Sequence, residues 1–126
     1  MTGKLERDKL LTAVKQISAS VAGFVCYVIA SADGKIIAQG GDCAKLRLPW
    51  LFRDTFGGKE EILSLFVFLE GKISPQHTSQ GDIHCMLLKP TRNIVVGIFH
   101  QGEPFSVSMY HEGNRIAADL DARMSR

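Results

Sequence analysis

The clearest pattern along the chain is a pair of apolar segments in residues 24–39, FVCYVIASADGKIIAQ, which are separated by a short polar break. β-Branched and aromatic residues on both sides of the break favour strands. Asp33-Gly34 within the break predicts a tight hairpin turn, because such turns require residues that tolerate positive φ. We therefore interpret Asp33 and Gly34 as a structural turn rather than a ligand site.

The first strand of this hairpin is apolar on both of its faces. Alternation along the strand places Phe24, Cys26, Val28 and Ala30 on one face and Val25, Tyr27 and Ile29 on the other. An antiparallel strand with one face in water should alternate between apolar and polar residues. The hairpin is therefore expected to form the middle layer of three, with other elements covering it on both sides.

Amphipathic helices are predicted near both ends of the chain. In residues 5–17 the apolar stripe consists of Leu10, Leu11, Val14 and Ile17, and charged residues surround it. In residues 104–124, Pro104 suits the first helical position. The apolar ladder of this second helix consists of Ile116, Leu120 and Met124. Gly113-Asn114 is expected to bend it.

Residues 43–70 allow more than one interpretation. Residues 43–56 have helical spacing, the pair Gly57-Gly58 interrupts them, and a second helix could begin at Lys59. The apolar run ILSLFVFL at 62–69 fits either this helix or a buried strand, because a short apolar run cannot be assigned by periodicity alone. Acidic residues at the start of the segment and Gly71 at its end favour the helix.

Three further strands are predicted in the second half of the chain. Residues 73–80 are weakly strand-like, and Pro75 restricts them to the edge of a sheet. Residues 82–89 and 93–100 are apolar on both faces, with a predicted turn at Pro90-Thr91-Arg92 between them. The order of elements predicts an α+β fold in which residues 1–126 form a single domain, a three-layer α/β/α sandwich around a central five-stranded antiparallel sheet.

The composition narrows the classes of protein that the chain can represent. Its 126 residues suffice for a core, and the hydrophobic fraction of 45% is ordinary. A net charge of +2 is too small to indicate nucleic-acid binding. No apolar run approaches the roughly 20 residues of a membrane span. Cys26, Cys43 and Cys85 are odd in number and widely spaced, which predicts free thiols, no disulfide and a cytoplasmic location.

No catalytic, metal-binding or cofactor-binding residues are predicted. The four histidines and Cys85 lack the short paired spacing of zinc sites. Cys85 and His100 could meet across paired strands, but nothing marks an oxyanion hole or a residue that would orient the base. The glycine pairs at 40–41 and 57–58 lack the Lys-Ser/Thr of a phosphate-binding loop.

Residues 47–56 carry the most informative surface signal. Large aromatic and apolar residues combined with arginine are typical of the centre of a protein–protein interface. The candidate interface residues are Arg47, Trp50, Leu51, Arg53 and Phe56. The alternative is that the apolar members, together with Phe52, all face the sheet, and the residues alone do not decide between the two.

In its layout the chain resembles the Roadblock / dynein light chain family. The resemblance is carried by the N-terminal helix, the segment SADGKIIAQGG, the strand pair MLLKPTRNIVVGIF and the closing helix, and it extends over essentially the whole chain. It implies a non-enzymatic homodimer in which the central helices pair and the two sheets can join. It also implies an adaptor that regulates a small Ras-like GTPase, or that scaffolds a signalling or motility complex, with no cofactor.

A second class of function also fits the predicted fold. Hydrophobic-Asp-Gly-hydrophobic hairpins occur in profilin-like and sensor domains as well, where a small molecule would bind between sheet and helix. A dimer with a filled core would favour the adaptor, whereas an apolar cavity would favour the sensor. A third class, a small hydrolase, has little support because no catalytic group is marked.

Overall fold

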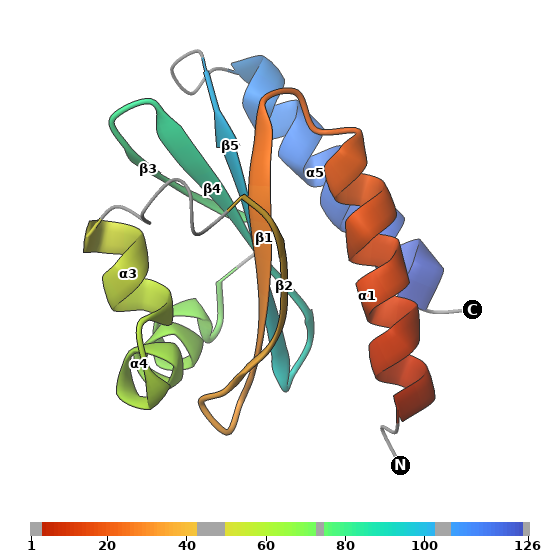
Figure 1. Cartoon of the computed structure of the whole chain (residues 1–126). Coiled ribbons are helices and arrows are strands. Elements are labelled where there is room, and N and C mark those ends of the chain that lie inside the picture. The colour runs from red at the N-terminus through yellow and green to blue at the C-terminus, as the bar shows by residue number, and fades with distance from the viewer. Residues whose placement is uncertain (1–3, 43–49, 73–74, 103–106, 125–126) are drawn as a thin grey trace.

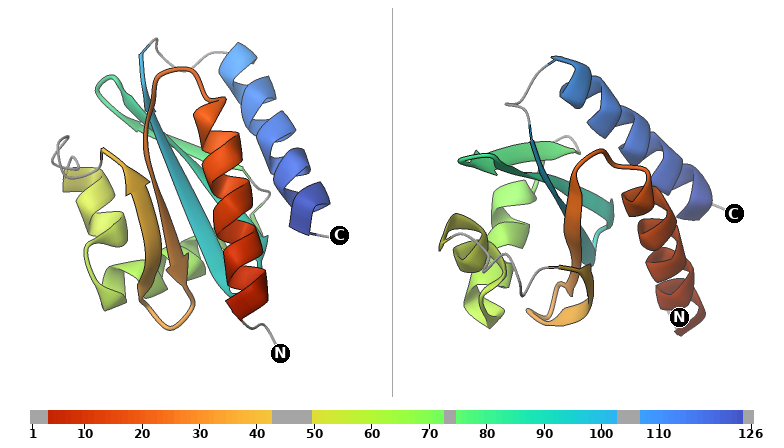
Figure 2. Two further views of the ribbon diagram at one scale, coloured as in Figure 1. Left: turned by 45° about the vertical axis from the view of Figure 1, so that its right-hand side comes forward. Right: turned by 45° about the horizontal axis from the view of Figure 1, so that its top comes forward.

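The computed structural model describes residues 4–42, 50–72, 75–102 and 107–124. In chain order the elements are α1 (Lys4–Ala19), β1 (Phe24–Ser31), β2 (Ile36–Gly41), α3 (Trp50–Phe56), α4 (Lys59–Leu69), β3 (Gln76–Gln80), β4 (Ile83–Thr91), β5 (Ile94–Gln101) and α5 (Val107–Met124). Figures 1 and 2 show three layers, in which α1 and α5 cover one face of the sheet and α3 and α4 cover the other. The predicted α/β/α arrangement is confirmed.

The sheet has five strands in the order β2-β1-β5-β4-β3, and each neighbouring pair is antiparallel. β1, β5 and β4 are the inner strands, and most of their residues are buried. β2 and β3 form the two edges. Pro75 directly precedes β3, as expected for an edge strand. The predicted five-stranded antiparallel sheet is therefore confirmed, and its third strand lies beside β4.

The sheet separates two apolar cores. The core beneath α1 and α5 includes Leu10, Val14, Ile17, Tyr27, Ile29, Met86, Ile98, Ile116 and Leu120. The core beneath α3 and α4 includes Cys26, Val28, Ala30, Phe52, Phe56, Ile62, Leu65, Leu69 and Phe99. Side chains of β1 alternate between the two cores, which confirms that this strand is covered on both faces.

The faces predicted for the start of β1 are wrong for Val25, which packs with the core beneath α3 and α4, and for Phe24. This residue packs with the core beneath α1 and α5, where its ring stacks on Tyr27 at a centroid distance of 6.5 Å. The cause is a shift in the pairing register with β5 between Phe24 and Cys26. A bulge of this kind reverses the alternation at the residue before it.

The β1–β2 turn forms at the predicted Asp-Gly. The Ser31 backbone N–H donates to the Lys35 carbonyl at 2.9 Å, and the Gly34 N–H donates to the Ser31 carbonyl at 2.9 Å. Gly34 has φ +86°, in the left-handed region that favours glycine. The Ser31 hydroxyl donates to the Asp33 carboxylate, and this hydrogen bond is the main reason that the pKa of Asp33 is lowered.

Replacing Gly34 by valine is expected to destabilise the fold by roughly 1–3 kcal/mol, because the left-handed backbone is strained for any residue with a Cβ atom. The new Cβ would also lie 2.5 Å from Lys59 Cγ and 3.0 Å from the Lys59 carbonyl oxygen, at the start of α4. Urea unfolding at neutral pH measures the loss. Asp33→Asn is the matched control and should be mild, since asparagine keeps an acceptor for the Ser31 hydroxyl.

The segment between β2 and β3, part of which the sequence allowed to be either helix or strand, contains two helices. α3 ends at Phe56, Gly57-Gly58 separates it from α4, and the Ile62 N–H donates to the Gly58 carbonyl at 3.0 Å in the first turn of α4. The helical interpretation of residues 62–69 is confirmed, and the strand alternative is wrong. Residues 43–49, which the predicted helix included, lie outside the described residues. Of the helices described, none is both long and apolar enough to cross a membrane.

The predicted turn between β4 and β5 is displaced. β4 continues through Thr91, which pairs with Ile94, so the turn consists of Arg92-Asn93 rather than Pro90-Thr91-Arg92. The register shifts between Leu88 and Thr91. Because Pro90 falls in this irregular stretch, the strand accommodates a residue that cannot donate a ladder hydrogen bond.

α5 is one continuous helix from Val107 to Met124, so Gly113-Asn114 does not interrupt it. Gly113 has a different role. A Cβ atom there would lie 2.6 Å from His77 Cε1 and 2.7 Å from His77 Nε2. The missing side chain lets α5 lie directly against the ring of His77 on β3.

The expectation of three free thiols is wrong. Cys26 is disulfide-bonded, whereas Cys85 is free and buried. Cys43 lies outside the described residues. The cytoplasmic location was expected because all three thiols were expected to be free. The cysteines therefore no longer support that expectation.

Candidate interaction surface

Three of the large apolar side chains that are exposed lie on α3 and α4. Trp50 is 65% exposed, Val67 71% and Phe68 56%. We call these three residues the α3–α4 surface. The other large apolar side chains that are exposed among the described residues, Ile36 and Tyr110, lie on β2 and α5. Large exposed apolar side chains can mark an interaction site, which makes these two helices the candidate surface.

The sequence candidates on α3 divide between this surface and the core. Trp50 and Arg53 are exposed, Leu51 is partly buried, and Phe56 is only 4% exposed. Arg47 lies outside the described residues. Phe56 belongs to the sheet-facing side with Phe52, as the sheet-facing alternative expects, whereas Trp50 belongs to the outward side. Whether Trp50 lies in an interface stays a prediction.

Two phenylalanines fix the orientation of α3. The rings of Phe52 and Phe56 pack edge-on against Phe99 of β5, with centroid distances of 5.0 and 6.0 Å. Gly97 of the same strand lies beneath Phe56, where a Cβ atom would come within 2.9 Å of Phe56 Cζ. Because this side of the short helix is anchored in the core, the opposite side with Trp50 is held outward.

The contribution of α4 to the surface was missed from the sequence. Ile62, Leu65 and Leu69 face the core, while Val67 and Phe68 point outward. The run ILSLFVFL carried a usable signal, because a helix that is apolar around its circumference needs a cover on more than one side. This signal could be read only once the segment was known to be a helix.

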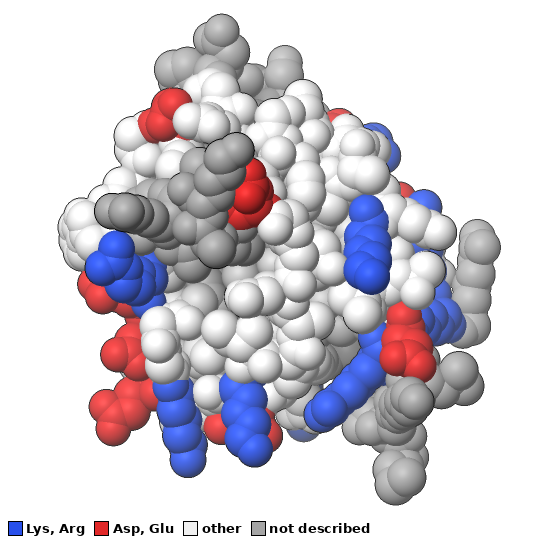
Figure 3. Space-filling view, viewed as in Figure 1, with Lys and Arg blue, Asp and Glu red and all other residues white. Residues whose placement is uncertain are grey.

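The surroundings of the α3–α4 surface are charged. Lys59, Glu60 and Glu61 are exposed in the first turn of α4, and the Lys72 ammonium lies 4.8 Å from the centroid of the Phe68 ring. In Figure 3, charged side chains of both signs lie along the edge of the molecule that α3 and α4 occupy in Figure 1. An apolar centre with a charged rim is the usual anatomy of a protein–protein interface.

The nucleophile pair considered from the sequence does not form. Cys85 is paired with Phe99, and His84 with His100. Cys85 contacts the core beneath α3 and α4, whereas successive residues on a strand point to opposite faces, so His100 lies on the other side of the sheet. Complete burial also raises the pKa of the Cys85 thiol. The thiol therefore stays protonated and packs as a small apolar group.

Three histidines instead meet on the face covered by α5. The rings of His84 and His100 are 5.3 Å apart between centroids, both side chains are 3% exposed, and His84 Nδ1 shares a 2.6 Å hydrogen bond with the Ser79 hydroxyl. His77 on the neighbouring strand lies under Gly113. Burial, followed by the charges of His84 and His77, lowers the pKa of His100 to about 4. Among the described residues, no group of three side chains is arranged to hold a metal ion.

Comparison of the coordinates with solved structures identifies the fold. MglB from Myxococcus xanthus superimposes with a TM-score of 0.66 at 9% sequence identity, covering 99% of this chain and 93% of that chain. A Roadblock/LC7 domain from Streptomyces avermitilis superimposes with a TM-score of 0.51 at 10% identity, covering 91% and 97%. The chain has the Roadblock fold.

A further structure, described as MglB with a tetrameric arrangement, matches this Roadblock fold with a TM-score of 0.61 at 10% identity and covers 99% of this chain and 93% of that chain. No protein-family model and no curated protein matches the sequence. At identities of this size the likeness concerns the fold, and it extends over 99% of this chain.

Proposed function

We propose that the protein is a homodimeric adaptor without enzymatic activity, and that the α3–α4 surface joins its two copies. The observation that carries the proposal is the exposure of Trp50, Val67 and Phe68 on the two helices that cover this face of the sheet. Covering these side chains removes apolar area from water, worth roughly 25 cal/mol per Å². Aromatic side chains of this size supply most of the binding energy in many interfaces.

The edge strand β3 gives the dimer a second point of contact. β3 lies at one end of the strand order, so one side of its backbone has no neighbour within the described sheet. Pairing of two such edges would continue the sheet across the dimer. The tetrameric arrangement recorded for an MglB structure supports self-association as a property of this fold.

The partner in this proposal is a small Ras-like GTPase, as the resemblance implies. The mechanism is conformational. The dimer binds the switch region of the GTPase and thereby shifts the balance between its nucleotide states. Such a role requires that the two copies be held in a fixed arrangement, and α3, which contributes to the proposed dimer interface, is anchored to β5 by the rings of Phe52 and Phe56.

The test uses the small Ras-like GTPases of the same genome, beginning with any that is encoded beside this gene. Each is loaded with GDP or with a non-hydrolysable GTP analogue, and binding of the purified full chain is measured by calorimetry. We expect one of them to bind with at least tenfold preference for one nucleotide state, which corresponds to about 1.4 kcal/mol. Equal affinity for both states would contradict a regulatory role.

A further pair of variants separates the turn from a binding site. Gly34→Val should weaken GTPase binding only as far as it unfolds the protein, and Asp33→Asn should leave binding unchanged. If Asp33→Asn abolished binding at unchanged stability, Asp33 would be a contact residue and the structural interpretation of the turn would be wrong.

A further inference from the structure

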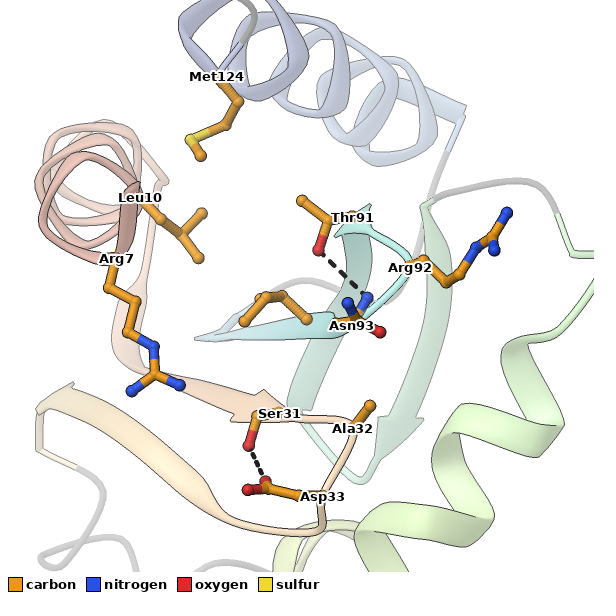
Figure 4. Close-up of a pocket in the computed structure, with 10 residues that line it drawn as sticks. Arg7, Leu10, Ser31, Ala32, Asp33, Thr91, Arg92, Asn93 and Met124 are labelled. Atoms are coloured by element: carbon orange, nitrogen blue, oxygen red, sulfur yellow. Dashed lines mark hydrogen bonds between the residues drawn. The ribbon is translucent and has the colours of Figure 1, made fainter. Parts of the chain in front are cut away.

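A cavity of about 380 Å³ opens at the end of the sheet where the β1–β2 and β4–β5 turns lie. α1 contributes Arg7 and Leu10 to its lining, the β1–β2 turn contributes Asp33, the β4–β5 turn leads into Ile94, and α5 contributes Met124. Figure 4 shows these side chains around one space between the two helices and the hairpins. Its volume lies within the range of small-ligand sites.

The two turns that frame the cavity are tied to each other. The Ala32 backbone N–H donates to the Asn93 carbonyl at 2.9 Å, and this bond joins segments that are far apart in the sequence. Within the second turn the Asn93 N–H donates to the Thr91 hydroxyl oxygen at 3.2 Å. The wall is therefore formed before any ligand arrives, which reduces the entropic cost of binding.

The lining combines an apolar surface with two arginines, of which Arg7 points into the space between α1 and the hairpin. Leu10, Ile94 and Met124 belong to, or pack against, the core beneath α1 and α5, and they present aliphatic and thioether groups to the cavity. Arg7 is exposed, and Figure 4 shows its guanidinium in the space between α1 and the hairpin. In the described part of the chain, Arg7 forms neither an ion pair nor a hydrogen bond.

Asp33, the one carboxylate of the lining, already accepts a hydrogen bond within the protein. Asp33 accepts a hydrogen bond from the Ser31 hydroxyl, and the neighbouring charge of Lys35 helps to lower its pKa. This carboxylate thus has its partners within the hairpin. The charge of Arg7 remains for a bound molecule, and a guanidinium selects carboxylates and phosphates.

We propose that this cavity binds a small amphiphilic anion, with a carboxylate or phosphate group at Arg7 and a short aliphatic body against Leu10, Ile94 and Met124. The cavity lies on the α1–α5 side of the sheet, opposite the α3–α4 surface (Figure 1). The proposal therefore stands independently of the adaptor role. It gives the protein a binding site for a small molecule, as the sensor interpretation of the sequence would require.

Decanoate and decyl phosphate are the probes, and 1-decanol is the neutral reference. Calorimetry on the full chain should give saturable binding of at least one anionic probe, at least tenfold tighter than 1-decanol. Arg7→Gln should remove that advantage, because a hydrogen bond to a charged group is worth about tenfold or more in affinity. The ratio between the two anionic probes distinguishes a carboxylate ligand from a phosphate ligand.

Arg92 provides the matched control. It borders the same cavity, but Figure 4 shows its guanidinium directed away from Arg7. Arg92→Gln removes the same charge from the protein and should keep the affinity of the wild type. Equal losses from Arg7→Gln and Arg92→Gln would show that only net charge matters and would overturn the site.

Methyl resonances locate the bound molecule. Decanoate should shift the signals of Leu10, Ile94 and Met124 and leave those of Val67 unchanged. Shifts confined to Val67 would mean that the probe covers the exposed α3–α4 surface instead. That result, or the absence of saturable binding by both anionic probes, would contradict the proposal.

Discussion

Trp50→Glu or Phe68→Glu is expected to convert the protein from a dimer to a monomer. Both side chains belong to the α3–α4 surface, at 65% and 56% exposure in the single chain. Glutamate is tolerated there in water, but in an interface it would be a buried charge without a partner, at a cost of several kcal/mol. Sedimentation equilibrium at tens of micromolar measures the change. A wild-type protein that sediments as a monomer at this concentration would contradict the dimer proposal.

Two control variants separate loss of association from loss of folding. Ala118→Glu adds the same charge at an exposed position of α5, on the opposite side of the sheet, and should leave the dimer intact. Phe56→Glu should instead unfold the protein, since Phe56 is 4% exposed and packs against Phe99. Circular dichroism of each variant shows which of the two effects occurs.

Acidification is expected to destabilise the fold well above the pH at which carboxylates titrate. The pKa of His100 is about 4 in the folded chain, against about 6.5 in an unfolded one. The unfolded state therefore binds the proton first. Stability is complete above pH 6.5 and falls as the pH drops from 6.5 toward 4. The loss reaches about 2 kcal/mol by pH 5 and about 3 kcal/mol at pH 4.

The surroundings of His100 explain the direction of this change. The groups that face it are the imidazoles of His84 on β4 and His77 on β3, with Phe24 of β1 paired beside it. Tyr110 and Gly113 of α5 lie against His77. None of these described neighbours carries a negative charge, so a protonated His100 would gain no ion pair to offset its desolvation.

Urea unfolding at pH 7, 6 and 5 measures the loss for the wild type and for His100→Leu. The leucine variant should show a flatter dependence on pH across this interval, because its side chain does not titrate. His111→Gln is the control: His111 is exposed on α5, so its removal should leave the dependence of the wild type unchanged. A His100→Leu protein that loses as much stability as the wild type between pH 7 and pH 5 would contradict the assignment.

The regular elements could be predicted because residue type or spacing marks each of them directly in the sequence. β-Branched and aromatic residues marked β1, and the ladder from Ile116 to Met124 marked α5. Local irregularities were less accessible. Pro90 was expected to end β4, yet the register shift between Leu88 and Thr91 carries it within the strand. Sequence periodicity indicates where a strand lies, but it does not indicate where the strand has a bulge.

Features that depend on long-range pairing were missed for a different reason. His77, His84 and His100 become neighbours only because β3, β4 and β5 pair in one particular register. A shift of one residue would place His84 on the opposite face of the sheet. The disulfide at Cys26 was missed likewise, because three cysteines at wide spacing do not reveal which of them meet.

The candidate interface residues could be predicted only in part. Helical spacing placed Trp50 and Phe56 on one helix, but the side on which each would lie depended on where the sheet runs beneath it. Phe56 reaches the core because Gly97 leaves room for its ring. No property of residues 47–56 by themselves points to that glycine on a distant strand.

The contact between Gly113 and His77 has a consequence for how the sequence of such a protein can change over time. Any side chain at position 113 would need the space that the His77 ring now fills. An alanine there would be accepted only after His77 had been replaced by something smaller, or after α5 had moved outward from β3. Substitutions at these two positions are therefore expected to arise in pairs among descendants of this sequence. In each of them, only one of the two positions should carry a large side chain.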